Sequence, residues 1–166
     1  FLYLGSSTGL STTAAWSAES NQVGAAFGAA VASAGDVNAD GYGDVVVGAS
    51  GYDNGETSEG RVYGYHGSES GLSATASWIG EVNFASANFG GALATAGDVN
   101  GDGFSDVMVG AVGYFDNGQT NEGRAFIYYG SATGLPDEPS WTAENNEAYS
   151  LFGFTVSTAG DVNGDG

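Results

Sequence analysis

The sequence predicts an all-β fold made of β-propeller blades, each built from four antiparallel strands. The main support is an internal repeat, in which one acidic string begins at Asp36, Asp98 and Asp161, so that the period is 62 to 63 residues. Within each period, short segments rich in β-branched and aromatic residues alternate with turns that contain glycine. The 166 residues include 30 glycines, which disfavours long helices, because a glycine inside a helix costs about 1 kcal/mol relative to alanine.

The first strand of each period is predicted to begin at a Phe-Gly pair. In the first copy, Phe27, Ala29, Val31 and Ser33 fall on one face of an alternating pattern. This period of two fits a pleated strand better than a helix. The three pairs are Phe27-Gly28, Phe89-Gly90 and Phe152-Gly153.

The other three strands follow in a constant order. The second is a continuous apolar run, as expected of a strand that is buried on both faces. The third is aromatic and β-prone, and the fourth surrounds a tryptophan. Turn signals separate the strands, among them a repeated Gly-Ser-x-x-Gly-Leu. The second strands are predicted at 45–49 and 107–111, the third at 61–65 and 124–128, and the fourth at Trp16, Trp78 and Trp141.

Four such strands in about 60 residues describe a propeller blade. A parallel β-helix is the main rival, but its coils are usually shorter and hairpin turns fit it poorly. Because propellers close with typically 4 to 8 blades, we expect the remaining blades of a longer chain, or other copies of this one, to complete the ring. The predicted units are a partial blade with a third and a fourth strand (1–22), two full blades (23–84 and 85–147), and a first strand with a truncated loop (148–166).

The loop between the first and second strands carries the predicted chemistry. Oxygen-bearing side chains occupy its positions 1, 3, 5 and 9, position 6 is glycine, and position 7 offers a backbone carbonyl. Ca²⁺ takes six to eight oxygen ligands in a flexible shell, whereas Mg²⁺ demands a tighter octahedron, and zinc or copper would prefer His or Cys. The sequence therefore predicts calcium sites. Their expected ligands are Asp36, Asn38, Asp40, Tyr42 and Asp44; then Asp98, Asn100, Asp102, Phe104 and Asp106; and, in an incomplete third loop, Asp161, Asn163 and Asp165.

Two other interpretations of these loops compete with calcium binding. Asp and Asn also form Asx-turns in solvated loops, but carboxylates held close together in repeated copies favour a bound cation, because like charges repel. An EF-hand loop requires a Glu at position 12 and an exiting helix. Position 12 here is Val47 or Val109, inside an apolar run, so the EF-hand is excluded.

Composition excludes several classes of function. Twenty carboxylates against two arginines and no lysine give a formal net charge of −18, which repels phosphate backbones and anionic lipid. We therefore expect neither nucleic-acid binding nor membrane insertion. There is no cysteine, so disulfides, thiolate metal sites and cysteine nucleophiles are absent.

The combination of these motifs resembles the FG-GAP repeat. The resemblance rests on Phe27-Gly28, the loop that ends at Asp44 and the following Gly48-Ala49-Ser50, with Phe89-Gly90, the loop that ends at Asp106 and Gly110-Ala111-Val112 in the second copy. The third residue of the usual Gly-Ala-Pro is Ser50 in one copy and Val112 in the other. Such repeats build the seven-bladed propeller of integrin α-subunits and occur in many bacterial secreted or surface proteins. The resemblance implies calcium on one face of the disc, partner binding by other loops, and a fragment of a bacterial secreted or surface protein.

The remaining conspicuous residues are expected to be structural. Arg61 and Arg124 occupy equivalent positions, and we expect each to pair with a nearby carboxylate rather than with a ligand. The lone His66 is expected to be a half-exposed strand residue, and no serine or threonine has a recognisable base. The repeated tyrosines of the third strand and the tryptophans of the fourth are expected to pack between blades.

Together these observations predict a non-catalytic, calcium-binding propeller segment that acts outside the cell in adhesion or ligand recognition, because weak calcium sites fill there. The partner, a protein or a carbohydrate, is not identified by the sequence. Two alternatives stay open: a propeller domain of a secreted enzyme, and a structural subunit of a surface layer or filament that assembles through open blade edges.

Overall fold

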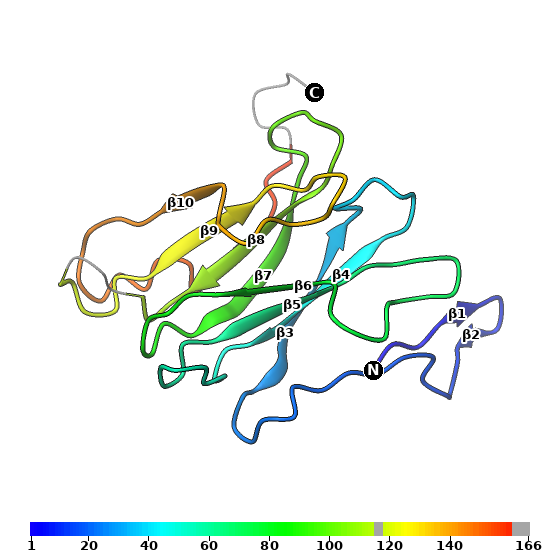
Figure 1. The fold of residues 1–166 in the computed structure, drawn as a ribbon, viewed down its shortest axis with the longest axis horizontal. Helices are drawn as coiled ribbons and strands as arrows, with labels where there is room; N and C mark the ends of the chain where they lie inside the picture. Colours follow the sequence, from blue (N-terminus) through cyan, green and yellow to red (C-terminus); the bar gives the residue numbers. More distant parts are fainter. Residues whose placement is uncertain (115–117, 161–166) are drawn as a thin grey trace.

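The computed structural model describes residues 1–114 and 118–160. All regular structure in these residues is β, as predicted, and most of it lies in two four-stranded sheets that pack side by side (Figure 1). None of the described residues forms a helix long and apolar enough to cross a membrane. The first sheet has the order β3-β4-β5-β6 and contains β3 (Phe27–Gly35), β4 (Asp44–Ala49), β5 (Arg61–Tyr65) and β6 (Trp78–Glu81).

The second sheet repeats the first. Its strand order is β7-β8-β9-β10, and neighbouring strands in both sheets are antiparallel. Each sheet is thus a meander of four consecutive strands, which confirms the predicted blades. The second sheet contains β7 (Phe89–Gly97), β8 (Asp106–Ala111), β9 (Arg124–Tyr128) and β10 (Trp141–Ala143).

The first strand of each blade is less regular than the alternating pattern predicts. Phe27 pairs with Ala49, but the next pair along the ladder is Ala30 with Gly48, so two extra residues bulge out of the strand. β7 has the same shift after Phe89. The prediction of an uninterrupted alternation through Ala29 was therefore wrong. The cause lies at the glycine of the Phe-Gly pair, whose positive φ bends the chain out of the pleat.

The core lies mainly between the two sheets. One face of the first sheet presents Val46 and Val62, which are fully buried in one cluster with Phe89, Val107 and Val109 of the second sheet. The opposite face of the first sheet packs in a second cluster that includes the N-terminal segment. The central strands are consequently covered on both sides, as their apolar runs predict.

The N-terminal segment retains traces of a blade. A bridge joins Leu2 to Trp16, at the positions equivalent to the β5–β6 pair of Gly64 and Trp78. The Gly-Ser-x-x-Gly-Leu turn forms the short hairpin of β1 (Gly5–Ser6) and β2 (Gly9–Leu10).

At the other end, Phe152 forms a parallel bridge to Gly123, just as Phe89 does to Gly60. The chain therefore begins a further blade in the same way. No strand is formed by residues 153–160, the last stretch that the structure describes.

Candidate metal centres

The two complete acidic loops lie at the same end of neighbouring sheets. One joins β3 to β4 and the other joins β7 to β8, and both project from the upper end of the molecule in Figure 1. The third predicted set, Asp161, Asn163 and Asp165, lies outside the described residues.

Side chains at positions 1, 3 and 5 of the first loop are turned toward the loop's own backbone. The two oxygens of Asp36 accept the N–H groups of Asp40 (3.1 Å) and Gly41 (2.8 Å). Asn38 Oδ1 also accepts the Asp40 N–H (3.2 Å), and its Nδ2 donates to Asp40 Oδ2 (2.9 Å). Asp40 Oδ1 accepts the N–H of Tyr42 (2.9 Å). Three oxygen-bearing side chains thus converge on one short turn.

The second loop reproduces this network. Asp98 accepts the N–H groups of Asp102 (3.0 Å) and Gly103 (2.8 Å), and Asn100 Nδ2 donates to Asp102 (2.8 Å). Asp102 in turn accepts the N–H of Phe104 (3.0 Å). Equivalent residues make the same hydrogen bonds in both loops, which indicates that the motif itself determines this geometry.

The aspartate at position 9 has a structural role that the spacing did not reveal. Asp44 is buried, and its two oxygens accept the N–H groups of Val37 and Gly67, both at 2.8 Å. It therefore ties the start of the loop to the segment that follows β5.

Asp106 does the same in the second blade, accepting from Val99 and Gly130 at 2.9 Å. Burial raises the pKa of the Asp106 carboxyl, whereas these two N–H groups act to lower it.

The donor chemistry of the loops fits a hard cation. Among the described residues, however, no three Asp, Glu or His side chains are arranged so that they could hold a metal together. The five-ligand site therefore stays a prediction. An ionised carboxylate has about four lone-pair sites, and each position-9 aspartate uses two of them on backbone N–H groups. Acceptor capacity is left at every carboxylate of both loops.

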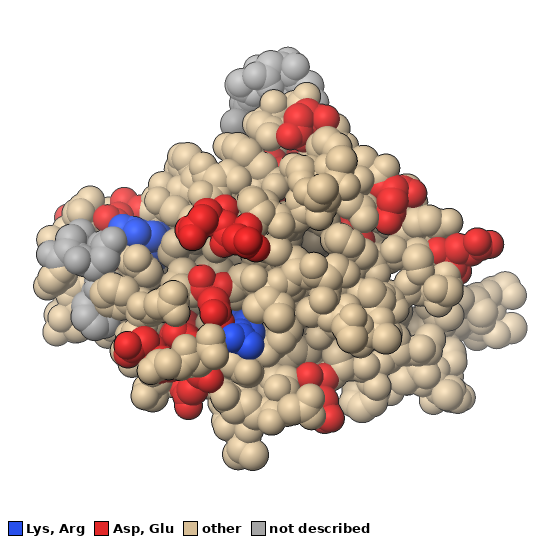
Figure 2. All heavy atoms as spheres, viewed as in Figure 1, with Lys and Arg blue, Asp and Glu red and all other residues tan. Residues whose placement is uncertain are grey.

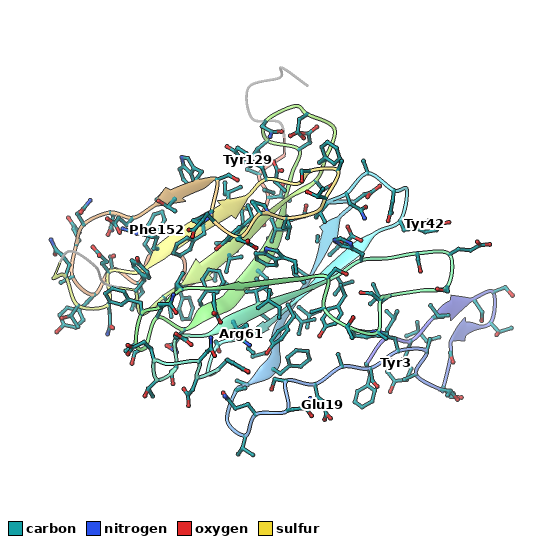
Figure 3. All side chains as sticks on the ribbon, in the orientation of Figure 1. Tyr3, Glu19, Tyr42, Arg61, Tyr129 and Phe152 are labelled. Carbon is teal, nitrogen blue, oxygen red and sulfur yellow. The ribbon has the colours of Figure 1, made fainter. Side chains whose placement is uncertain are left out.

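Basic side chains do not balance the charge of the loops. Both arginines sit next to carboxylates elsewhere, and on the face shown in Figure 2 the red carboxylates at the upper end have no blue neighbour. Figure 3 places Tyr42, in the first loop, and Arg61 at opposite ends of the sheet. Near the first loop, the half-buried His66 follows β5, and its Nδ1 lies 3.5 Å from Asn38 Nδ2.

The structure confirms the predicted roles of the arginines. Arg61 donates from Nε and Nη2 to Glu81 across the β5–β6 pair (2.9 and 2.5 Å), and Arg124 binds Glu144 in the equivalent way. The sequence did not reveal that the Arg61 guanidinium also lies 4.1 Å from the centre of the Tyr52 ring. These arginines therefore hold the third and fourth strands together.

Packing between blades, predicted for the tryptophans, is confirmed for Trp16 and Trp78. Trp16 meets Tyr65 edge-on at 4.8 Å, and Trp78 meets Tyr128 at 5.0 Å. Each indole N–H also donates to a backbone carbonyl of the following blade, for example Trp78 to Pro136 (2.8 Å). Trp78 is buried and Trp16 is partly buried, whereas Trp141 keeps 49% of its exposure.

One pair of buried acids was not recognised from the sequence. Glu59 and Glu122 are fully buried, and none of their carboxyl oxygens has a hydrogen-bond partner in the described part of the chain. The available signal was the repeated Glu-Gly-Arg at the start of the third strand.

Comparison with known proteins finds relatives that include phospholipases and integrin alpha chains. A family model of the FG-GAP repeat matches residues 27–65 and 89–128. Phosphatidylinositol-glycan-specific phospholipase D of Bos taurus is 40% identical over 139 residues, which are 78% of this chain and 16% of that protein. Integrin alpha-E of Mus musculus is 34% identical over 155 residues (89% and 13%), and integrin alpha-7 of Homo sapiens is 38% identical over 141 residues (84% and 11%). The chain thus spans less than a fifth of each relative, and these three mammalian proteins do not support a bacterial source.

Proposed function

Because this chain is an FG-GAP repeat protein, we propose that it is a calcium-stabilised β-propeller segment that serves outside the cell as an adhesion or ligand-recognition scaffold. The observation that carries the proposal is the pair of acidic loops with the same inward hydrogen-bond network. The resemblance of the loops to calcium-binding FG-GAP repeats supports the choice of metal.

In the proposed role, calcium supplies positive charge to a loop that carries three aspartates within nine residues. The first site uses the side chains of positions 1, 3, 5 and 9 and a backbone carbonyl, and the second uses their equivalents. Asp44 and Asp106 then have a double task, since each also anchors its loop to the blade. The proposed ligands are Asp36, Asn38, Asp40, the Tyr42 carbonyl and Asp44, and Asp98, Asn100, Asp102, the Phe104 carbonyl and Asp106.

The scaffold role is supported by the integrin relatives and by the way the blades use their conspicuous side chains. The arginines and two of the three tryptophans are engaged within or between blades. We assign no catalytic role to this segment, because its single histidine, His66, packs beside Asn38 and next to the turn at Gly134.

The phospholipase relatives favour a second candidate, in which the segment is a propeller domain of a secreted enzyme. The segment is then a structural or substrate-presenting part, and the chemistry belongs to the rest of that protein. A third possibility, assembly through open blade edges, predicts a concentration-dependent mass. Light scattering of the purified chain tests this third possibility, because a monomer at all concentrations excludes self-assembly.

Calcium removal tests the central proposal. A ligand that binds only the folded state at 10 times its Kd stabilises that state by about 1.4 kcal/mol per site. Two sites with a Kd of about 10⁻⁴ M should therefore raise the Tm by about 5–10 °C in about 1 mM calcium over the value in chelator. The measurement is thermal unfolding followed by circular dichroism.

Two variants make this test specific. Asp40→Ala and Asp102→Ala should each remove part of the calcium-dependent rise, and the double variant should remove all of it. Magnesium at the same concentration should give a smaller rise. An identical melting curve in chelator and in calcium would contradict the proposal.

A further inference from the structure

The two acidic loops touch one another across the boundary between the blades. Ser105, at position 8 of the second loop, donates its backbone N–H to the carbonyl of Asp36 (3.0 Å). Asp36, at position 1 of the first loop, returns a hydrogen bond from its own N–H to Ser105 Oγ (3.1 Å). Ser105 of the second loop therefore binds the backbone of Asp36, which is the first expected ligand of the first loop.

A third hydrogen bond reinforces this contact. Ser131, in the β9–β10 turn, donates its N–H to the carbonyl of Val37 (3.0 Å). The segments are closely packed at this point, because a Cβ added to Gly130 would lie 2.5 Å from the Ser105 carbonyl oxygen and 2.7 Å from that of Val37. The start of the first loop has little room to move independently of the second blade.

The two loops also differ in how far their side chains are exposed. Asp36 and Asn38 of the first loop are half-buried, whereas Asp98 and Asn100 of the second loop are exposed. Position 8 of the first loop is Gly43, which has no hydroxyl group to offer. Among the described residues, a side chain at position 8 therefore contacts the other acidic loop only in the second loop.

We propose that Ser105 is a positioning residue that couples the two calcium sites, so that metal at either loop strengthens binding at the other. This inference rests on the proposed calcium binding. Metal in the second loop orders Ser105, and an ordered Ser105 holds Asp36 in place, so less ordering remains for the first loop when its own ion binds. By linkage, the effect on affinity must be the same in both directions.

Site-resolved calcium titration of the whole chain tests the coupling. The amides of Gly41 and Gly103 each donate to the position-1 aspartate of their own loop, so their ¹H–¹⁵N resonances report the two sites separately. In Asp102→Ala, the Kd at the Gly41 loop should rise by about fivefold, a coupling at the lower end of the usual range. In Asp40→Ala, the Kd at the Gly103 loop should rise by the same factor.

Ser105→Ala tests whether the coupling between the two calcium sites passes through Ser105. It removes the hydrogen bond from Asp36 N–H to Ser105 Oγ but keeps the backbone hydrogen bond to the Asp36 carbonyl, so it should reduce the affinity of the first loop in the wild-type chain and should have a smaller effect in Asp102→Ala. Ser131→Ala is the matched control, because its contact with Val37 uses the backbone N–H, which the substitution retains.

The outcomes separate this inference from the one on which it rests. If both amides respond to calcium but Asp102→Ala leaves the first loop within twofold of its wild-type Kd, coupling is refuted and calcium binding stands. Coupling that survives intact in Ser105→Ala refutes the role of this residue. If neither amide of the wild-type chain responds, both proposals fall.

Discussion

Glu59 and Glu122 are the residues least expected in a folded interior. Buried carboxyl groups almost always have hydrogen-bond partners, yet none of the oxygens of these two side chains has one in the described part of the chain. Burial raises the pKa of the Glu59 carboxyl above its ordinary value of 4.5. The backbone N–H of Asn54, which lies near the carboxyl without making a hydrogen bond of good geometry, and Arg61 act to lower it, whereas the nearby Glu81 and Glu56 act to raise it.

This shift predicts that Glu59 makes stability depend on pH. A carboxyl whose pKa is raised by folding contributes most to the stability of the folded state below its unfolded pKa. This contribution is lost as the pH rises through the folded pKa. Glu59→Gln removes the charge at nearly constant volume, so we expect its Tm to exceed that of the wild type by about 2–4 °C at pH 7. The gap should shrink as the pH falls to about 4.

Thermal unfolding between pH 4 and pH 8 checks this expectation. Glu19→Gln is the control, since that side chain is exposed in another part of the chain and should not change the pH profile. A difference between Glu59→Gln and the wild type that is the same at every pH would mean that ionisation of Glu59 is not its cause.

At the level of the strand pair, the same arginine–glutamate ion pair joins the third and fourth strands of each blade. Arg61 in β5 lies directly opposite Glu81 in β6, and the side chains retain only 14% and 28% of their exposure. The guanidinium also covers the Tyr52 ring. Arginine suits this position because its planar fork binds a carboxylate through two N–H groups while stacking on an aromatic face.

Arg61→Lys should therefore destabilise the chain although it keeps the charge. We expect a loss of about 1–2 kcal/mol, because lysine makes neither the paired hydrogen bonds nor the stacking. Urea unfolding measures the loss, and a double-mutant cycle with Glu81→Gln isolates the pair. A loss that disappears in 1 M salt would indicate an ordinary exposed ion pair instead.

At the level of the whole molecule, the blades approach one another through their backbones. A Cβ added to Gly48 in β4 would lie 2.0 Å from the carbonyl oxygen of Gly90, which follows Phe89 at the start of the next blade. Gly90 itself has a φ of +81° and faces Val62 at close range. The equivalent contact joins β8 to the segment after Phe152. The glycine of the Phe-Gly pair is thus required by the junction between blades as well as by the bulge.

Gly48→Ala should accordingly weaken the joint between the blades. Because the obstacle is backbone rather than a flexible side chain, we expect a loss of about 3 kcal/mol. Gly5→Ala, where an added Cβ meets nothing within 4 Å, should cost much less. Denaturant unfolding followed by tryptophan fluorescence compares the two, and equal midpoints would show that the interface adapts without cost.

Much of this protein follows from short stretches of its sequence. The repeat, the strands and the turn-like geometry of positions 1 to 7 in each loop depend on residues that are close neighbours in the chain, so their pattern alone determined them. The Asp36, Asn38 and Asp40 side chains are held by amides no more than five residues away.

Other features were decided only when distant segments met. The bond from Gly67 to Asp44 spans 23 residues, and that from Asp36 to Ser105 spans 69. The burial of Glu59 and the contact of Gly48 with Gly90 likewise depend on how one blade is placed against the next. A local pattern specifies dihedral angles and which face of a strand is apolar, but it contains no information about which backbone atom of the neighbouring sheet will lie opposite. Packing of the two sheets supplies that choice.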